Sequence, residues 1–525
     1  MKQAKWSRFT RTAALCLLSA AVPVVLGAFV RTQRGGAELL NQVFSIVATR
    51  AVDSLPADSV YVKAARGLVD GLNDPYAEFY TPKEIKDFMR NSIGNAYGGL
   101  GMAIILQGRG VVINDVFPGS PAARGGAQRG DQIMAIDGVP TTGWTTDNVS
   151  QHLTGAIGTT VKVSLGKPGV AEPVVTTFTR GEVHASAVPY VLLLKDSIGY
   201  IPLQRFNNTA GAEVDHAVAS LRTEGARRFV IDLRGNGGGD VDQAVAVSNL
   251  FLKTGAEVAT QRERGGNNKV YVAKSVSPYP TEPLAVLIDQ GTASASEIVA
   301  GALQDHDRAV ILGSTSFGKG LVQGVYDLDG GYALKLTTGK WYTPSGRSIH
   351  RDRKLVDGVL TLVDTTTDTM AAHAHGPETH SDAGRVLIAN GGITPDVTIA
   401  AEPLTSGDER FSRAVGTQGA AVRNAIYELA RDQRDHVPAN FTVTPTLRDS
   451  LYVRLTAAGL TVDRPAFDAG SNLIDRLLER QTLQIAFGDS AAVLRSIPTD
   501  PVMTRALGLL GKAHSESDVY AGIHS

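Results

Sequence analysis

The stretch RRFVIDLRGNGGGD, residues 227–240, indicates the class of fold. Its apolar run is short, is rich in β-branched and aromatic residues, and ends in a glycine-rich loop, as is typical of a buried strand. Residues with helical spacing precede it at Val214, Val218 and Leu221, and a second helix is predicted over 240–252. A strand flanked in sequence by two helices indicates an α/β domain whose sheet is at least partly parallel.

The same alternation continues on both sides of this stretch. Three further apolar runs are predicted to be strands: SIGYIPL (197–203), PLAVLID (283–289) and RAVILG (308–313). A helix is predicted to begin near Ser294, between the last two of these runs. We therefore assign residues 183–350 to one α/β domain, which resumes at 390–402.

The remaining regions differ in pattern. Residues 97–182 contain short β-rich runs separated by glycine and proline, with one helical candidate near Asn148–Leu153, and predict a small, mostly β module. Residues 33–96 and 403–525 have apolar positions at helical spacing and are predicted to be helical. The polar stretch 351–389 interrupts the α/β pattern and is predicted to be a surface insertion.

The N-terminus has the pattern of a secretory signal. Four basic residues precede the uncharged run Thr12–Val30, and arginine returns at positions 31 and 34. Residues 1–32 therefore predict either a cleaved signal peptide or an uncleaved anchor in the inner membrane through residues 12–30, and the pattern leaves both open. The one cysteine, Cys16, lies in this run, so the rest of the chain has no disulfide to form, which is compatible with a bacterial periplasm or cell envelope.

Composition bounds the class of protein and its partners. The chain has 525 residues, of which 43% are hydrophobic and 20% charged, which predicts a globular protein of roughly three domains. Its formal net charge is -1, and it has no long basic run. Nucleic acid is therefore not an expected partner.

The stretch GTASASEI, residues 291–298, has two interpretations. Ser294, followed three residues later by Glu297 and then by an apolar run, matches the capping box that starts many helices. The serine could equally be a nucleophile, because loops that follow the strands of an α/β sheet gather functional sites. Ser296 is the nearest rival nucleophile.

The loop GSTSFGKG, residues 313–320, also has two interpretations. It fits part of a phosphate-binding P-loop, but Gly320 stands where a magnesium-binding hydroxyl is needed, and the next segment alternates like a strand. Alternatively, Lys319 is a base: burial would lower its pKa toward neutrality, so that a free amine could take a serine proton. Its other interpretation is a solvated surface lysine. Gln323 would lie on the same face of an extended segment and orient the amine, or it is simply a polar residue on a strand edge.

Backbone amides near both loops could stabilise a developing negative charge. The amide of Ala295 stands at a predicted helix N-terminus, and further amides are available in the flexible glycines 237–239. Nucleophile, base and oxyanion donors therefore all have candidates.

These residues, with the motifs around them, resemble the carboxyl-terminal processing peptidases, also called tail-specific proteases. The similarity runs from Asp74 to about His350 and resumes at 391–397. The motifs that carry it include DPYAEFYTP (74–82), GGLGM (98–102), GSPAARGGAQRGDQIMAIDG (119–138), VIDLRGNGGG (230–239), SFGKGLVQ (316–323) and WYTPSGRSI (341–349). The resemblance implies an α/β fold with a crotonase-like (ClpP/crotonase) peptidase core and an inserted PDZ domain.

The resemblance also implies a serine endopeptidase that uses neither metal nor cofactor. It assigns the nucleophile to Ser294, the base to Lys319, 25 residues later, and the supporting amide to Gln323. The oxyanion amides fall on Ala295 and on the paired glycines, where we choose Gly238 over its neighbour.

The segment Gly99, Leu100, Gly101 and Met102 resembles the carboxylate loop of a PDZ domain. Such a loop binds a free protein C-terminus through successive backbone amides, so the expected substrates are unfolded or tail-exposed envelope proteins. A simple turn into a strand is the other interpretation of this segment.

Several questions stay open from sequence. A non-catalytic PDZ scaffold that binds C-terminal tails in the envelope is the rival function. Three histidines, His373, His375 and His380, suggest a metal tract, but in a polar insertion we expect them to be solvated. The helical region 403–525 could support a homo-oligomer or a docked partner. The natural substrate, an adaptor and gating by the PDZ domain are not determined by the sequence.

Overall fold

The computed structural model describes eight ranges: 36–53, 55–92, 96–108, 110–356, 359–362, 378–389, 391–400 and 404–523. These residues form two compact units, the first from the residues up to 81 together with 324–337 and 354–360, the second from the rest. Among the described residues, no helix combines the length and the apolar character that a membrane span requires. The predicted signal segment 12–30 lies outside the described residues.

The first unit is small and largely helical. Residues 36–50 form a helix, and α2 (Ala57–Asp70) follows. Strand β1 (Glu78–Tyr80) then pairs antiparallel with the beginning of β18 (Ala333–Tyr342). Lys335 on β18 lies 2.9 Å from the Glu78 carboxylate, which adds an ion pair to this strand pairing.

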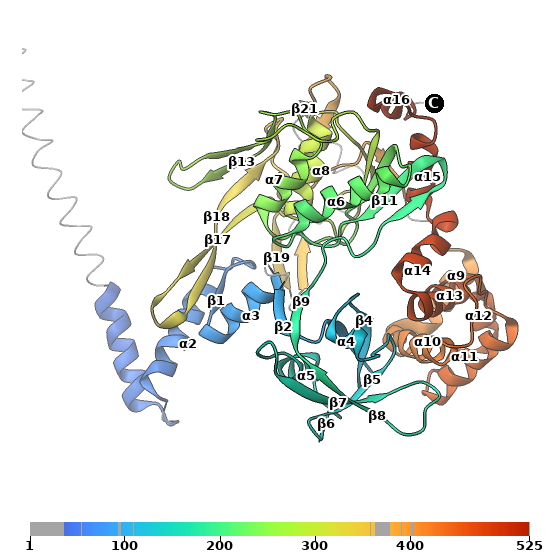
Figure 1. Cartoon of the computed structure of the whole chain (residues 1–525). Helices are drawn as coiled ribbons and strands as arrows, with labels where there is room; N and C mark the ends of the chain where they lie inside the picture. Colours follow the sequence, from blue (N-terminus) through green and yellow to red (C-terminus); the bar gives the residue numbers. More distant parts are fainter. Residues whose placement is uncertain are drawn as a thin grey trace, which may run out of the picture. The chain divides into compact units, whose positions relative to one another are not determined.

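The second unit is built around a six-stranded sheet (Figure 1). Its strands in spatial order are β10 (Leu192–Leu194), β11 (Ile198–Pro202), β12 (Arg228–Asp232), β15 (Leu284–Ile288), β16 (Val310–Gly313) and β23 (Val397–Thr398). Every neighbouring pair from β11 to β23 is parallel, and only β10 runs antiparallel to its neighbour. This sheet confirms the predicted α/β class.

Helices cover both faces of this sheet, because its strands carry apolar side chains on both faces. One face packs against α6 (Ala210–Thr223), α7 (Val241–Asn249) and α8 (Ala295–Asp305), and the other against α15 (Pro501–Leu510) and α16 (Glu516–Ala521). Neighbouring residues of one strand point to opposite faces, so Ile231 joins the cluster with α6 to α8 and Val230 joins the cluster with α15.

Residues 96–184 form a separate, mostly β module. Its sheet has the order β3 (Met102–Gln107), β4 (Gly110–Val116), β5 (Gln132–Ile136), β7 (Thr160–Gly166) and β8 (Val174–Thr179), with β6 (Val139–Pro140) paired to β5. The helices α4 (Pro121–Arg124) and α5 (Thr146–Leu153) complete it. At the two ends of the module, β2 (Ala96–Gly99) and β9 (Gly181–His184) pair with each other.

The C-terminal residues are helical and pack against this β module. The helices are α9 (Ser406–Val415), α10 (Gly419–Gln433), α11 (Pro445–Ala457), α12 (Arg464–Ala469), α13 (Ser471–Phe487) and α14 (Asp489–Ser496). Their apolar cluster includes Val112 of β4. Asp131, fully buried, forms ion pairs with Arg434 of the helical region at 2.9 Å and with Lys167 at 2.6 Å.

The polar insertion is predicted as a surface element over 351–389. Residues 363–377 lie outside the described part of the chain. Residues 378–389 pack against the α/β core: Leu387 is buried, and Arg385 pairs with Asp307 and Asp396, each at 2.5 Å. Ion pairs thus join this polar segment to the core, while half of its twelve residues stay exposed.

Candidate active site

Ser294 lies on a sharp turn between a strand and a helix. Five residues separate it from the end of β15, and it immediately precedes α8, with backbone angles φ 58° and ψ -118°. A positive φ is uncommon for any residue other than glycine, and residues held in such conformations cluster at functional sites. The serine is half-buried, whereas all residues of α8 behind it are buried.

Glu297 is fully buried and connects the two candidate loops. Its Oε2 atom accepts the backbone N–H groups of Ser294 and of Lys319, each at 2.8 Å. Its Oε1 atom accepts the N–H of Gly318 at 2.7 Å and the hydroxyl of Ser316 at 2.5 Å. Burial raises the pKa of Glu297, against the lowering effect of these four hydrogen bonds. Because one carboxylate oxygen accepts both amides, the backbone nitrogens of Ser294 and Lys319 lie no farther apart than two hydrogen-bond lengths.

The capping interpretation of Ser294 is supported by the structure. A capping box is present at the start of α8, and the Glu297 carboxylate accepts the Ser294 amide at 2.8 Å. Capping by Glu297 and a chemical role for Ser294 are compatible.

Ser296, the rival nucleophile, is in a different situation. Its side chain is fully buried, and its hydroxyl donates to the backbone oxygen of Asn236 at 2.9 Å. Asn236 also accepts the N–H of Ala293 at 3.0 Å and donates its amide to Leu203 at 2.7 Å. Ser296 and Asn236 thus fasten the glycine-rich loop after β12 to the turn before α8. Sequence reasoning missed Asn236, whose only signal was its place among glycines.

Lys319 lies in the loop before β17 (Leu321–Asp327), Gln323 lies within that strand, and both are half-buried. The glycines beside Lys319 allow close packing against residues 349–351. A Cβ at Gly318 would lie 2.9 Å from Arg351 Cγ, and one at Gly320 would lie 2.8 Å from the His350 nitrogen. A strand follows this loop where a P-loop requires a helix, so the P-loop interpretation is wrong.

Gly238 lies directly against the turn that contains Ser294. Its φ is 95°, and a Cβ on it would lie 2.7 Å from the Ala293 oxygen and 2.9 Å from the Ala295 nitrogen. Ala295 is the first residue of α8, so its amide has no acceptor within its own helix. The Gly238 amide, in contrast, donates to the Asn236 side chain at 2.9 Å. The structure thus brings both predicted oxyanion residues together.

The predicted carboxylate loop is the link between β2 and β3. The oxygen of Leu100 accepts the Ala122 amide at 2.7 Å, and the oxygen of Gly101 accepts the Phe117 amide at 3.0 Å. In a trans peptide the N–H points opposite to the C=O, so the amides of Gly101 and Met102 point away from residues 117–122. The side chains of Leu100 and Met102 are buried.

Of the three histidines considered as metal ligands, only His380 lies among the described residues, where it is an exposed residue of β21 (Glu378–His380). His373 and His375 fall outside them. Within the described ranges, no cluster of three histidine, cysteine or carboxylate side chains has the arrangement of a metal site.

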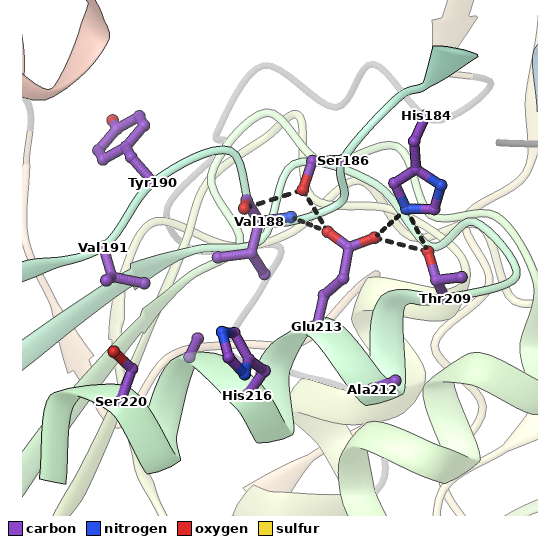
Figure 2. A pocket seen from close by; sticks show the side chains of 11 residues that line it. His184, Ser186, Val188, Tyr190, Val191, Thr209, Ala212, Glu213, His216 and Ser220 are labelled. Carbon is purple, nitrogen blue, oxygen red and sulfur yellow. Dashed lines mark hydrogen bonds and ion pairs between the residues drawn. The ribbon is translucent and has the colours of Figure 1, made fainter. Parts of the chain in front are cut away.

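A second polar cluster lies where the chain leaves β9, beside a cavity of about 450 Å³ (Figure 2). Glu213 of α6 accepts the Ala187 and Val188 amides at 2.7 and 3.0 Å and the Thr209 hydroxyl at 2.5 Å, and it also binds His184 and Ser186. Burial raises the pKa of Glu213, but these hydrogen bonds outweigh it and lower the pKa. Glu213 thus accepts hydrogen bonds that hold the exit of the β module against α6. No local pattern in the sequence predicts this role.

Comparisons with known proteins agree with this architecture. Residues 197–361 match the family model "Peptidase family S41", and residues 92–166 match the model "PDZ domain". A carboxy-terminal-processing protease of Bartonella bacilliformis is 35% identical over 314 residues, which are 59% of this chain and 71% of that protein. The carboxy-terminal processing protease CtpA of Bacillus subtilis is 31% identical over 312 residues, 59% of this chain and 66% of that protein.

Among solved structures, the photosystem II D1 C-terminal processing protease is similar at 28% identity. That match covers 71% of this chain and 90% of the other, with a TM-score of 0.38.

A strand-to-helix turn that carries a serine, joined to a lysine loop and combined with a PDZ domain, defines the class of serine-type peptidases with PDZ domains. The match to the Bartonella protein establishes the family: the chain belongs to peptidase family S41, the carboxy-terminal processing proteases. PDZ domains bind C-terminal peptides.

Proposed function

We propose that this protein is an endopeptidase with a Ser–Lys dyad that recognises protein C-termini. Ser294 is the nucleophile, Lys319 is the base, and Gln323 orients the lysine amine. The observation that carries the proposal is the shared carboxylate oxygen of Glu297, which accepts the backbone amides of Ser294 and Lys319, each at 2.8 Å. It brings together two residues that are 25 positions apart in the sequence.

The proposed reaction has two halves. The neutral amine of Lys319 takes the hydroxyl proton of Ser294 as the serine oxygen attacks the scissile carbonyl carbon. The lysine ammonium then gives this proton to the leaving amine, the C–N bond breaks, and an acyl-enzyme remains. A water molecule, deprotonated by the same amine, then attacks the ester carbon. The ammonium gives this proton to the serine oxygen as the ester C–O bond breaks, which releases the new C-terminal acid, ionised at neutral pH, and the free serine.

The amides of Ala295 and Gly238 are the proposed oxyanion donors. Ala295 offers an amide at a helix N-terminus, where the helix dipole favours negative charge. The Gly238 amide donates to Asn236 Oδ1 in this structure, so it must give up that hydrogen bond to donate to the oxyanion. This exchange requires a small rotation of one peptide, which glycine permits.

The segment Gly99, Leu100, Gly101 and Met102 is the proposed tail-binding site. The carbonyls of Leu100 and Gly101 accept hydrogen bonds from residues 117–122. The amides of Gly101 and Met102 therefore point the opposite way, where they can donate to a carboxylate. The tail would then add to the free edge of β3, since β3 has only β4 as a neighbour among the described strands.

We further propose a crotonase-like topology for the peptidase core and an envelope location. The packing of α6, α7 and α8 together on one face of a parallel sheet supports the topology. The basic, then apolar, N-terminus supports export, with residues 12–30 as a cleaved signal or a membrane anchor. Unfolded or tail-exposed envelope proteins are the proposed substrates, and no metal or cofactor enters the reaction.

The test is cleavage of an unfolded protein with an apolar C-terminal tail by the wild type and three variants. We expect Ser294→Ala and Lys319→Ala to lose cleavage, and Ser296→Ala to retain most of it because its hydroxyl has a structural partner. Loss of cleavage in Ser296→Ala alone would overturn the assignment of the nucleophile. If the wild type binds the tail without cutting it, the protein acts as a tail-binding scaffold instead.

A further inference from the structure

The edge strand β3 has two faces with different surroundings. Ile104 packs against the apolar core of the PDZ module, whereas the next residue, Ile105, packs against the apolar cluster of the C-terminal helices. Gln107, two residues on, points the same way as Ile105 and donates to the Asn424 side chain of α10 at 2.8 Å. The C-terminal helical region therefore covers one face of the strand whose free edge would receive a tail.

A cavity of about 1000 Å³ lies between this face and the helices α9, α10 and α13. We call it the β3–α10 groove. It is lined by Ile105, Leu106 and Gln107 from β3 and, among others, by Phe411, Tyr427 and Leu477 from the helices. Leu477 is 40% exposed, and the buried Tyr427 hydroxyl has no hydrogen-bond partner. The groove is thus large and partly apolar, and it contains a polar group whose hydrogen-bonding capacity is unused.

The groove also has a definite charge. Arg423 and Arg480 line it, and none of its described lining residues is acidic. Both arginines are exposed, and neither forms an ion pair within the part of the chain that the structure describes. Positive side chains without local partners favour a ligand with carboxylates.

We propose that the β3–α10 groove is an extension of the tail-binding site, which accepts alternate residues of the substrate tail and selects apolar and acidic side chains there. The proposal rests on the proposed capture of tails by residues 99–102. It goes beyond a PDZ site because the C-terminal helices supply most of the groove.

Strand geometry determines which tail residues would enter the groove. A tail that pairs with β3 has its last residue near Met102, and the sixth residue from its end near Gln107, because both strands advance about 3.3 Å per residue. The last side chain points to the Leu100 and Met102 face, which is the PDZ core. Alternation then turns the second, fourth and sixth residues from the end toward the groove, and the third and fifth away from it.

The experiment measures binding of fluorescent eight-residue tails to the full chain carrying Ser294→Ala, which prevents cleavage. Each tail ends in an apolar residue with a free carboxylate and carries one Glu or one Lys at the sixth or at the fifth position from the end. At the sixth position we expect the Glu tail to bind about three- to tenfold more tightly than the Lys tail. At the fifth position we expect less than a twofold difference.

The matched variants test whether the groove arginines cause this preference. Arg423→Glu/Arg480→Glu should reverse the preference at the sixth position. Arg410→Glu/Arg413→Glu makes the same change in net charge on exposed residues of α9 outside the groove and should leave the preference intact. Tails with an amidated C-terminus test the capture step itself.

The outcomes separate the two proposals. A preference that is equal at both positions, or that survives the Arg423→Glu/Arg480→Glu change, overturns the groove while tail capture stands. Failure of every free-acid tail to bind more tightly than its amidated form overturns tail capture, and the groove proposal falls with it. A position-dependent preference that only the groove variant reverses supports both.

Discussion

Replacing Gly238 by alanine is expected to lower the rate of peptide hydrolysis at least about a hundredfold in a chain that still folds. The added Cβ would lie 2.7 Å from the Ala293 oxygen, 2.9 Å from the Ala295 nitrogen and 2.9 Å from Ser294 Cβ. All three distances are shorter than carbon atoms normally tolerate, so either the loop after β12 or the turn before α8 must shift. The methyl group also occupies the space in front of the Ala295 amide, where the oxyanion would lie.

The expected magnitude follows from two effects. An alanine at the φ of 95° found for Gly238 is strained by about 1–2 kcal/mol, which lowers stability but does not unfold a domain of this size. Loss of one oxyanion donor lowers kcat by about 10²–10³-fold. Because the methyl group blocks one donor and displaces the other, kcat should fall at least a hundredfold, and the affinity for tails should be unchanged.

Steady-state cleavage and thermal unfolding are measured together for Gly238→Ala and for Gly237→Ala. Gly237 is the matched control, since its φ is not positive and a Cβ there would meet no atom within 4 Å. The control should keep kcat within about threefold, as surface substitutions without special contacts do. If Gly238→Ala retains more than a tenth of the wild-type kcat while the control behaves as expected, the oxyanion assignment is wrong.

Three further predictions concern buried charges. Glu297→Gln keeps the side-chain size but replaces one acceptor oxygen by a donor, so the two hydrogen bonds that this oxygen accepts are lost. Kinetics should show kcat reduced at least tenfold with KM unchanged. Asp396→Asn, at a buried carboxylate elsewhere, should leave kcat unchanged. Burial outweighs the attraction of Arg308 and raises the pKa of Glu516 to about 7. The protonated Glu516 therefore contributes its full stability below the ordinary glutamate pKa, and this contribution is lost as pH rises toward 7. In Glu516→Gln, the free energy of unfolding should no longer fall with pH over this range. Arg434→Ala removes a partner of the fully buried Asp131 and should lower the free energy of unfolding in urea by about 3 kcal/mol; an unchanged midpoint would mean that the pair contributes nothing.

Local pattern was sufficient to predict the elements of the α/β domain. The run FVIDL (229–233) and the run LAVLI (284–288) are apolar on both faces, and such runs are typical of strands covered on both sides. The turn at Ser294 and the strand after Lys319 were also predictable, because capping residues and alternation act within a few positions.

Contacts between distant segments could not be predicted in the same way. Asn236 lies among glycines, and nothing near it indicates that it binds the turn before α8. The C-terminal helices have their own helical pattern, but only the folded chain shows that Arg434 reaches Asp131, 303 residues away. Sequence could not reveal the β3–α10 groove, since its two walls are joined only by such contacts.

The position of Glu297 explains how one short motif can be both a helix cap and part of the proposed catalytic arrangement. A capping carboxylate normally satisfies one amide at the helix start and leaves its second oxygen to water. Here burial excludes water, so the remaining acceptor sites must be satisfied by protein donors. Gly318, Lys319 and the Ser316 hydroxyl supply them. The need to satisfy a buried carboxylate is therefore what draws the lysine loop to the serine turn, and any substitution that removes its charge should separate the two before it unfolds the helix.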